Sequence, residues 1–413
     1  MAITILDKSA HQSFSLAEHR AFDQFFLQNL TPILVAEILA DLSRKYENKS
    51  PSEEVVTLAR KFLGSGPVVN ADFRKLVILD LLGNGPPLTP QVAIDYGNRV
   101  QARDGENGLV IDLHPHNVAL LRWRSGEFQE AEKIVAELWR EASLNVSADV
   151  FMQRMEQRGI ILPDVGSLGE AMWAIDAMLA DPKMQLDWLG VLAKDLGLGP
   201  ILHGQVLARW RAAPSAPLKS FAPYAHHCLR VMLLNAVATK NRRVGLKPTN
   251  YLDTQYLYYL PFCHIFCSMD KFHRELAPHL LRDDQSFVWA EHLKKALKRL
   301  SEWWSSLSDH QKKLYVRERG SYPPETSGCL VSQLWNNHCL PFSRRGSRED
   351  AIPDEVNHSV RDLVQSAEEA LRTGKPMPTS EDGSELIVLR KYQSSRREIR
   401  EKFGIELPPD EKK

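Results

Sequence analysis

Ile3-Thr-Ile-Leu-Asp7-Lys8-Ser9 is the stretch of sequence that decides the fold. The apolar run at 3–6 predicts a short buried strand, and Asp7 follows directly at its end. A carboxylate at the end of a buried strand is costly unless a cation or hydrogen bonds compensate its charge. Asp7 is therefore the first candidate for a functional site.

Three further acidic residues lie in similar apolar surroundings. Glu37 lies within Pro32-Ile-Leu-Val-Ala-Glu-Ile-Leu-Ala-Asp41, Asp253 ends Asn250-Tyr-Leu-Asp, and Asp270 ends Ile265-Phe-Cys-Ser-Met-Asp. A shared divalent metal would compensate their charges, and oxygen ligands favour Mg²⁺ or Mn²⁺ over Zn²⁺. The sequence therefore predicts a Mg²⁺ or Mn²⁺ site whose ligands and catalytic residues are Asp7, Glu37, Asp253 and Asp270.

Each acid also has a structural explanation. An Asp after a strand is often a turn residue or a helix cap, and for Asp7 and Asp253 taken singly this reading is as good as the metal reading. Asp270 is placed to cap a following helix, which is compatible with metal binding. Glu37 is harder to explain structurally because its neighbours are apolar. Asp41, one helical turn further on, is an additional or substitute ligand.

Helical patterns dominate the rest of the chain. Residues 14–29 predict a helix, and Thr31-Pro32 predicts the start of a second one, since Pro suits a first helical turn. Helical periodicity continues through most of 53–245 and returns at 286–320. The region from 344 onward is polar and only partly helical.

The pattern of acids resembles the PIN-like nuclease family. Asp7-Lys8-Ser9 matches the Asp-x-Ser that ends the first strand of the family, and Glu37 matches its helical Glu in an apolar setting. Asp253 and Ser268-Met269-Asp270 match a helix that opens with Asp and a strand that ends in Ser-x-Asp. The resemblance covers about residues 1–46 and 228–285.

The chain departs from the family in its middle. Roughly two hundred residues separate Glu37 from Asp253, where the family keeps the two acids much closer. The family's small turn with Gly before the last strand is replaced by Leu260-Pro-Phe-Cys-His264.

The resemblance implies an α/β fold: a three-layer PIN-like core with a central parallel sheet, interrupted by a large, mostly helical insertion. It divides the chain into a first part of the core at 1–46, a helical insertion at 47–227, a second part of the core with a helical extension at 228–343, and a polar tail at 344–413.

The resemblance also implies an activity, which is metal-dependent hydrolysis of phosphodiester bonds by an endoribonuclease. RNA is the expected substrate because it is the commoner one in the family, and a toxin or an antiviral defence effector is the expected role. Ser9 and Ser268 are expected to orient ligands or water. The alternative is a degenerate PIN-like domain that serves as a scaffold, binding nucleic acid or a protein partner through the helical insertion.

Charge limits where nucleic acid binds. The chain has 52 basic and 52 acidic side chains, so a binding surface requires local segregation of charge. One basic segment lies shortly before Asp253, and we expect it to contact phosphates, although a solvated loop explains it equally well. The segment consists of Lys240, Arg242, Arg243 and Lys247.

Other features favour a cytoplasmic protein with no membrane partner. The apolar residues before Asp7 are too few for a signal peptide, and the stretch at 256–267 is too short to span a membrane. Five dispersed cysteines do not form a disulfide framework. The phosphate-loop, dinucleotide-binding and hydrolase-elbow motifs are absent from the sequence.

Overall fold

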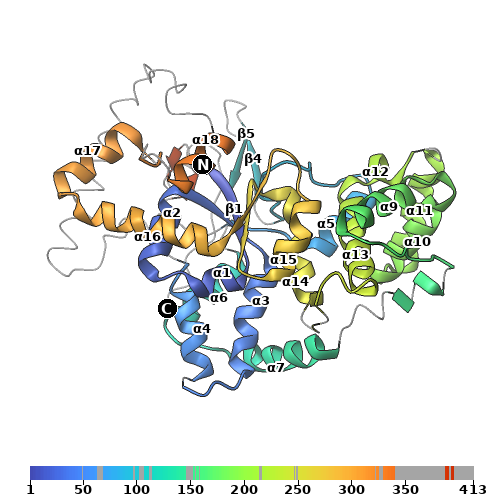
Figure 1. Cartoon of the computed structure of the whole chain (residues 1–413), viewed down its shortest axis with the longest axis horizontal. Coiled ribbons are helices and arrows are strands. Elements are labelled where there is room, and N and C mark those ends of the chain that lie inside the picture. The colour runs from blue at the N-terminus through green and yellow to red at the C-terminus, as the bar shows by residue number, and fades with distance from the viewer. Residues whose placement is uncertain are drawn as a thin grey trace. The chain divides into compact units, whose positions relative to one another are not determined.

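The computed structural model forms two compact units, Met1–Asp95 with Leu113–Leu340 and Tyr96–Asp112 with Pro341–Lys413 (Figure 1). The residues it describes are 1–48, 50–62, 68–95, 98–101, 107–110, 114–145, 152–153, 155–157, 159–213, 216–245, 247, 250–320, 322–324, 329–339, 387–389 and 392–394. Across the described residues, no helix is long and apolar enough to cross a membrane.

A five-stranded sheet lies at the centre of the first unit, with the order β3-β2-β1-β6-β7 and parallel pairing throughout. The chain starts at the central strand, adds two strands on one side, and then returns to add two on the other side. The point between β1 and β6 is thus the topological switch point, where α/β sheets bind ligands. The expected α/β fold with a central parallel sheet is confirmed. The strands are β1 (Ala2–Leu6), β2 (Phe26–Leu30), β3 (Val68–Val69), β6 (Ile265–Ser268) and β7 (Ser286–Trp289).

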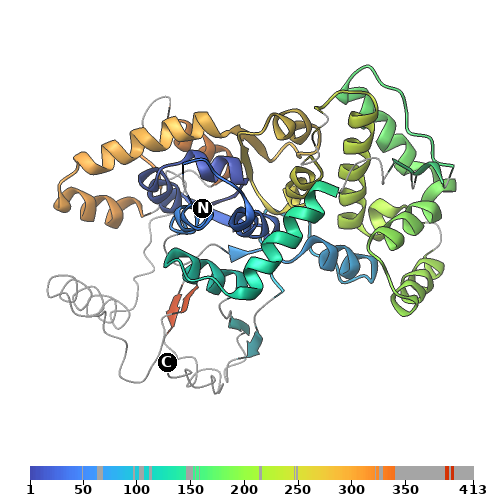
Figure 2. The same cartoon turned by 90° about the horizontal axis from the view of Figure 1, so that it is seen from below.

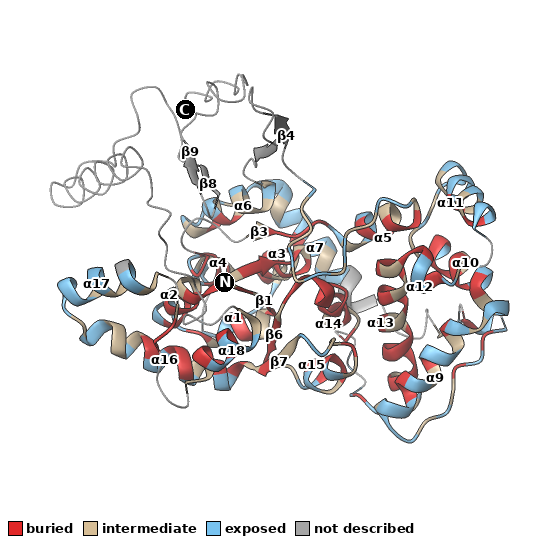
Figure 3. Cartoon of the chain, turned by 90° about the horizontal axis from the view of Figure 1, so that it is seen from above, coloured by how far each residue is buried: buried red, intermediate tan, exposed pale blue. Residues whose placement is uncertain are grey.

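One face of the sheet packs on α2 (Leu16–Phe25), α16 (Ala290–Ser306) and α18 (Leu330–His338), which share one hydrophobic core with it. Helix α16 buries Leu293, Ala296, Leu297 and Leu300, the spacing of one helical face. Helix α2 begins with a capping box between Ser15 and Glu18. Figure 3 shows these buried faces in red around the sheet.

The other face of the sheet carries alternate residues of the same strands, including Ile5 and Phe266. Helix α3 (Pro32–Ala40) lies near this region and packs against α7 (Glu130–Asn145), the teal helix of Figure 2. Helix α14 (Asn250–Leu257) contacts both α3 and α15 (Lys271–Leu276). These helices place side chains near the carboxyl ends of β1 and β6.

A helical group gathers at one end of the first unit (Figure 1). The buried carboxylate of Asp80 accepts hydrogen bonds from the backbone N–H groups of Tyr224 and Ala225. Arg209 donates to the carbonyls of Asp80, Leu81 and Phe221, so polar contacts join three of the helices. The group comprises α5 (Phe73–Leu81), α9 (Leu168–Ala180), α10 (Gln185–Asp195), α11 (Pro200–Ala212), α12 (Leu218–Phe221) and α13 (Pro223–Lys240).

The remaining elements are short or peripheral. In the first unit they are α1 (Lys8–Ser13), α4 (Pro51–Ala59), α6 (Pro115–Arg124), α17 (Asp309–Arg319) and the 3-10 turns Asp41–Ser43, Pro182–Met184, Leu260–Phe262 and Ala277–His279. The second unit contains two antiparallel pairs, β4 (Asn98–Gln101) with β5 (Asn107–Val110) and β8 (Ile387–Leu389) with β9 (Tyr392–Ser394).

Two helix predictions were wrong at one end. The helix expected at 14–29 ends at Phe25, and the next five residues form β2. Pairing with β1 overrides the local periodicity, and buried Gln28 and Asn29 bond to His11 and to the Phe262 carbonyl. The helical region expected at 286–320 begins instead with β7, because Ser286–Trp289 pairs with β6.

The segment expected as an insertion, 47–227, is mostly helical, but it also supplies β3 of the central sheet and the hairpin of the second unit. Its described parts outside 96–112 belong to the same compact unit as the sheet. In the tail at 344–413, the described residues are those of β8 and β9, and the remainder lies outside the described residues.

Ile5 provides a test of the central sheet. Its side chain is fully buried in β1, so Ile5→Ala should lower the free energy of unfolding by about 2–5 kcal/mol through lost burial and a residual cavity. Ile201→Ala is the matched control, because Ile201 is 78% exposed on α11. Urea unfolding of both variants measures the difference, and equal values for the two would contradict the position assigned to β1.

Candidate functional site

Asp7 lies where β1 ends and α1 begins, and it is almost completely buried. Its carboxylate accepts the Ala10 N–H at 2.8 Å, so Asp7 caps the helix as its structural reading predicted. The same carboxylate accepts the hydroxyls of Ser9, at 2.8 and 2.7 Å, and of Ser268, at 2.6 Å. Asp7 is therefore both a cap and the centre of a polar cluster.

The two serine hydroxyls join the carboxyl ends of β1 and β6. Ser9 Oγ accepts the Met269 N–H at 2.9 Å, and Ser268 Oγ accepts the Asp270 N–H at 2.9 Å. Each hydroxyl thus links the Asp7 carboxylate to the backbone that follows β6. Both serines therefore bind Asp7, and their expected role in orienting ligands or water stays a prediction.

His273 forms an ion pair with Asp7. Its ring is fully buried on α15, with Nδ1 at 3.2 Å from Asp7 Oδ2 and Nε2 at 2.8 Å from the Asp253 carbonyl. Burial disfavours the charged ring, but the hydrogen bond to Asp7 and the charges of Asp7 and Asp253 outweigh it and raise the His273 pKa to about 9. His273 is therefore an imidazolium at neutral pH.

Glu37 faces this cluster from α3. It accepts a hydrogen bond from the hydroxyl of Tyr256 on α14. Burial raises the pKa of Glu37, and Asp7 adds to the rise, whereas Lys8, Tyr256 and His273 oppose it. Although its sequence neighbours are apolar, the Glu37 side chain therefore lies among polar and charged groups.

Asp253 shows that the four acids converge. Burial is the largest cause that raises its pKa to about 7, and the carboxylates of Glu37, Asp270 and Asp7 raise it further against the opposing charge of His273. Like charges shift a pKa in this way only when they lie close together. Asp253 therefore lies within electrostatic range of the other three acids.

Asp270 and Asp41 have different surroundings. Asp270 caps α15 by accepting the Phe272 N–H at 2.7 Å, and it remains partly exposed beside Asp253. Asp41 begins a 3-10 turn after α3 and forms an ion pair of 2.7 Å with Lys8. Lys8 also donates to the Glu37 carbonyl at 3.0 Å, so it holds Asp41 in a separate ion pair beside the cluster.

Sequence reasoning missed three residues of the site, namely Lys8, Tyr256 and His273. All three had a usable signal, since Lys8 follows Asp7 directly and His273 lies three residues after Asp270, close to it on one helical turn. Tyr256 stands three residues after Asp253 in the same way.

The basic segment before Asp253 makes internal contacts. Lys240 donates to the Leu162 carbonyl at 2.6 Å and pairs with Asp164 at 2.9 Å. Arg243 donates to the Val165 carbonyl at 2.9 Å. Arg242 and Lys247 are exposed. Two of the four cations thus bind the loop at 162–165, which gives them a structural role.

Comparison with known proteins gives no relative: no family model, no curated protein and no solved structure matches the chain. Within the described residues, no three His, Cys, Asp or Glu side chains stand in an arrangement that could hold a metal ion. The four acids converge electrostatically, and the oxygens of Asp7 and Glu37 are hydrogen-bonded to donors of the chain itself.

Proposed function

We propose that the four converging acids form the catalytic site of a metal-dependent nuclease that hydrolyses phosphodiester bonds, with RNA as the substrate. The observation that carries the proposal is the environment of Asp253, whose pKa is raised by burial and by three other carboxylates. An acid with a strongly raised pKa near the switch point of a parallel sheet is typical of a functional site.

The donor chemistry suits Mg²⁺ or Mn²⁺, because Asp7, Glu37, Asp253 and Asp270 offer only carboxylate oxygens. Such an ion, when bound, activates water and neutralises charge on the phosphate. The residues of the chain perform the positioning. Ser9 and Ser268 fix the orientation of Asp7, and the His273 ring lies 3.2 Å from the same carboxylate.

A second candidate function is a binding scaffold without catalysis. It is favoured by the compensation of Asp7 by His273 and of Asp41 by Lys8, together with the absence of a three-donor metal group in the described residues. In that case the acids would maintain the fold at the switch point, and nucleic acid or protein would bind elsewhere. The toxin and defence roles stay predictions under either function.

Cleavage of end-labelled single-stranded RNA and DNA by the purified chain separates the two functions. We expect cleavage with Mn²⁺ or Mg²⁺, none with EDTA, and a loss of more than about 100-fold in Asp7→Asn, beyond the 10–100-fold typical of residues that only position a ligand.

Asp283→Asn is the control, because Asp283 is exposed and has no part in the cluster. Failure of the wild-type chain to cleave either nucleic acid with either ion would favour the scaffold. Cleavage by Asp7→Asn at the wild-type rate would show that the acid cluster is not the catalytic site.

A further inference from the structure

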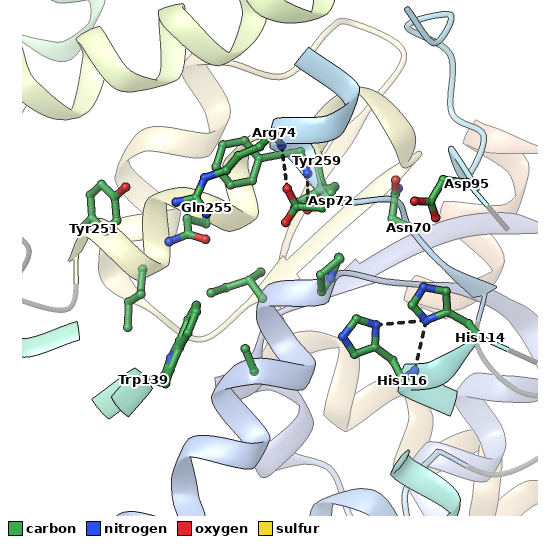
Figure 4. Close-up of a pocket in the computed structure, with 15 residues that line it drawn as sticks. Asn70, Asp72, Arg74, Asp95, His114, His116, Trp139, Tyr251, Gln255 and Tyr259 are labelled. Carbon is green, nitrogen blue, oxygen red and sulfur yellow. Dashed lines mark hydrogen bonds between the residues drawn. The ribbon is translucent and has the colours of Figure 1, made fainter. Parts of the chain in front are cut away.

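A cavity of about 420 Å³ lies beside the acid cluster, between α3, α5, α7 and α14 and the start of α6 (Figure 4). This volume is within the range of small-molecule sites. Its walls combine apolar side chains, among them Ala36 and Leu252, with the aromatic rings of Trp139 and Tyr251. It is therefore suited to a flat ligand with an apolar face.

Gln255 is the polar side chain of the cavity that can select a ligand. Its side chain is 8% exposed, and its amide makes no hydrogen bond to any described residue. Figure 4 shows it inside the cavity between Tyr251 and Arg74. The amide oxygen and nitrogen are not among the enclosed polar atoms without a partner, so they face the open space of the cavity, where a ligand that offers both an acceptor and a donor can pair with them.

Charge at the other end of the cavity is low. Burial lowers the pKa of His114, and burial together with the neighbouring His114 lowers the pKa of His116 to about 4, so both rings are neutral at pH 7. Asp95 is paired with Lys75 at 2.5 Å. The cavity thus favours an uncharged ring, and Arg74, which is exposed at its edge, is left to meet an anionic group.

The cavity and the acid cluster share two helices. On α3, Ala36 lines the cavity and the next residue, Glu37, faces the acids. On α14, Leu252 and Gln255 line the cavity, whereas Asp253 and Tyr256 belong to the cluster. The two sites therefore occupy neighbouring faces of the same helices, so one extended strand can reach both.

We propose that this cavity binds an unstacked nucleobase of a single-stranded nucleic acid, adenine in preference, while the backbone of the strand lies at the acid cluster. A Gln amide pairs with the N6 and N7 positions of adenine through two hydrogen bonds. Trp139 and Tyr251 supply stacking surfaces that accept any base. The inference rests on the proposed function, since it names the substrate of the same site.

Binding of a fluorescent single-stranded oligonucleotide, measured by anisotropy with the full chain in EDTA, tests the pocket without cleavage. The probes are an adenine oligonucleotide and a matched one with abasic positions. Gln255→Leu should reduce the preference for adenine over other bases by about 5- to 150-fold, the range of one two-bond pair. Trp139→Ala should weaken binding of every base by about 5- to 150-fold, the range of one stacking contact.

Trp173→Ala is the matched control, because Trp173 is 78% exposed on α9, and it should bind like the wild type. Gln255→Leu should unfold at the wild-type temperature or above it, since the amide has no partner to lose. Equal binding of the adenine and abasic probes by the wild type would overturn the proposal. A second outcome would also overturn it: adenosine monophosphate binds to the wild type but not to Gln255→Leu, and no oligonucleotide binds. The occupant of the cavity would then be a free nucleotide.

These outcomes are separable from those of the cleavage assay. Loss of cleavage in Asp7→Asn with no effect of Gln255→Leu on base preference would support the nuclease function and contradict the base-binding role of the cavity. Base-dependent binding by a chain that cleaves neither RNA nor DNA would support the base-binding role of the cavity and contradict the nuclease function.

Discussion

His273→Leu is expected to lower the free energy of unfolding by about 3–5 kcal/mol, the cost of breaking a buried ion pair by removing one partner. The variant leaves the Asp7 carboxylate buried without its cation. It also removes the ring that contacts the Ser268 hydroxyl at 2.9 Å and the Asp253 carbonyl. Urea unfolding at pH 7 measures the loss, and His310→Leu, at an exposed position of α17, is the control.

The same pair makes wild-type stability depend on pH. The His273 pKa rises from 6.5 to about 9 on folding, so its stabilisation is fully present below pH 6.5 and is lost as the pH rises through about 9. A shift of this size corresponds to about 3 kcal/mol. His273→Leu should show a flatter stability profile between pH 6 and 10. Identical profiles for the wild type and the variant would show that His273 is not charged in the fold.

Asp253→Asn is expected to act in the opposite direction, raising stability while it abolishes cleavage. The Asp253 pKa rises from 3.8 to about 7 on folding, so above pH 7 the folded state carries a carboxylate that its surroundings disfavour. The neutral amide removes that cost, which we put at about 2 kcal/mol after allowing for the partial exposure of Asp253. The gain should be present at pH 8 and largely lost at pH 4, because the cost builds up only as the pH rises above the unfolded pKa of 3.8.

Urea unfolding of Asp253→Asn at the two pH values, combined with the cleavage assay, tests whether the variant is more stable and also inactive. Asp283→Asn should change neither stability nor cleavage, because it alters an exposed carboxylate outside the cluster. A loss of stability in Asp253→Asn at pH 8 would mean that Asp253 is a structural residue. Functional residues that destabilise the fold are expected where selection acts on activity.

The sequence allowed the α/β class to be predicted, and it singled out acids beside apolar runs as candidates for the site. Asp7 after an apolar run, and Asp270 after another, can be recognised without any long-range information. Their convergence could be expected only as a consequence of parallel strands ending at one edge of a sheet. The raised pKa of Asp253 agrees with that expectation.

The features that could not be predicted depend on contacts between distant residues. Strand β2 has a helical pattern, and it is a strand because β1 pairs along it. The spacing of His273 from Asp270 is visible in the sequence, but its contact with Asp7, 266 residues away, is not. Gln255 is one polar residue within a helix, and only the cavity around it gives it a role.

The central claim is that the four acids bind a divalent ion, and a titration of the full chain with Mn²⁺, followed by electron paramagnetic resonance of the free ion at pH 8, tests it most directly. The wild type should bind Mn²⁺, and Asp253→Asn, which is expected to be the more stable protein, should bind it at least about 10-fold more weakly, as loss of a ligand or its support does. Asp283→Asn should match the wild type. Equal Mn²⁺ binding by the wild type and Asp253→Asn, or none by the wild type at millimolar concentration, would contradict the account.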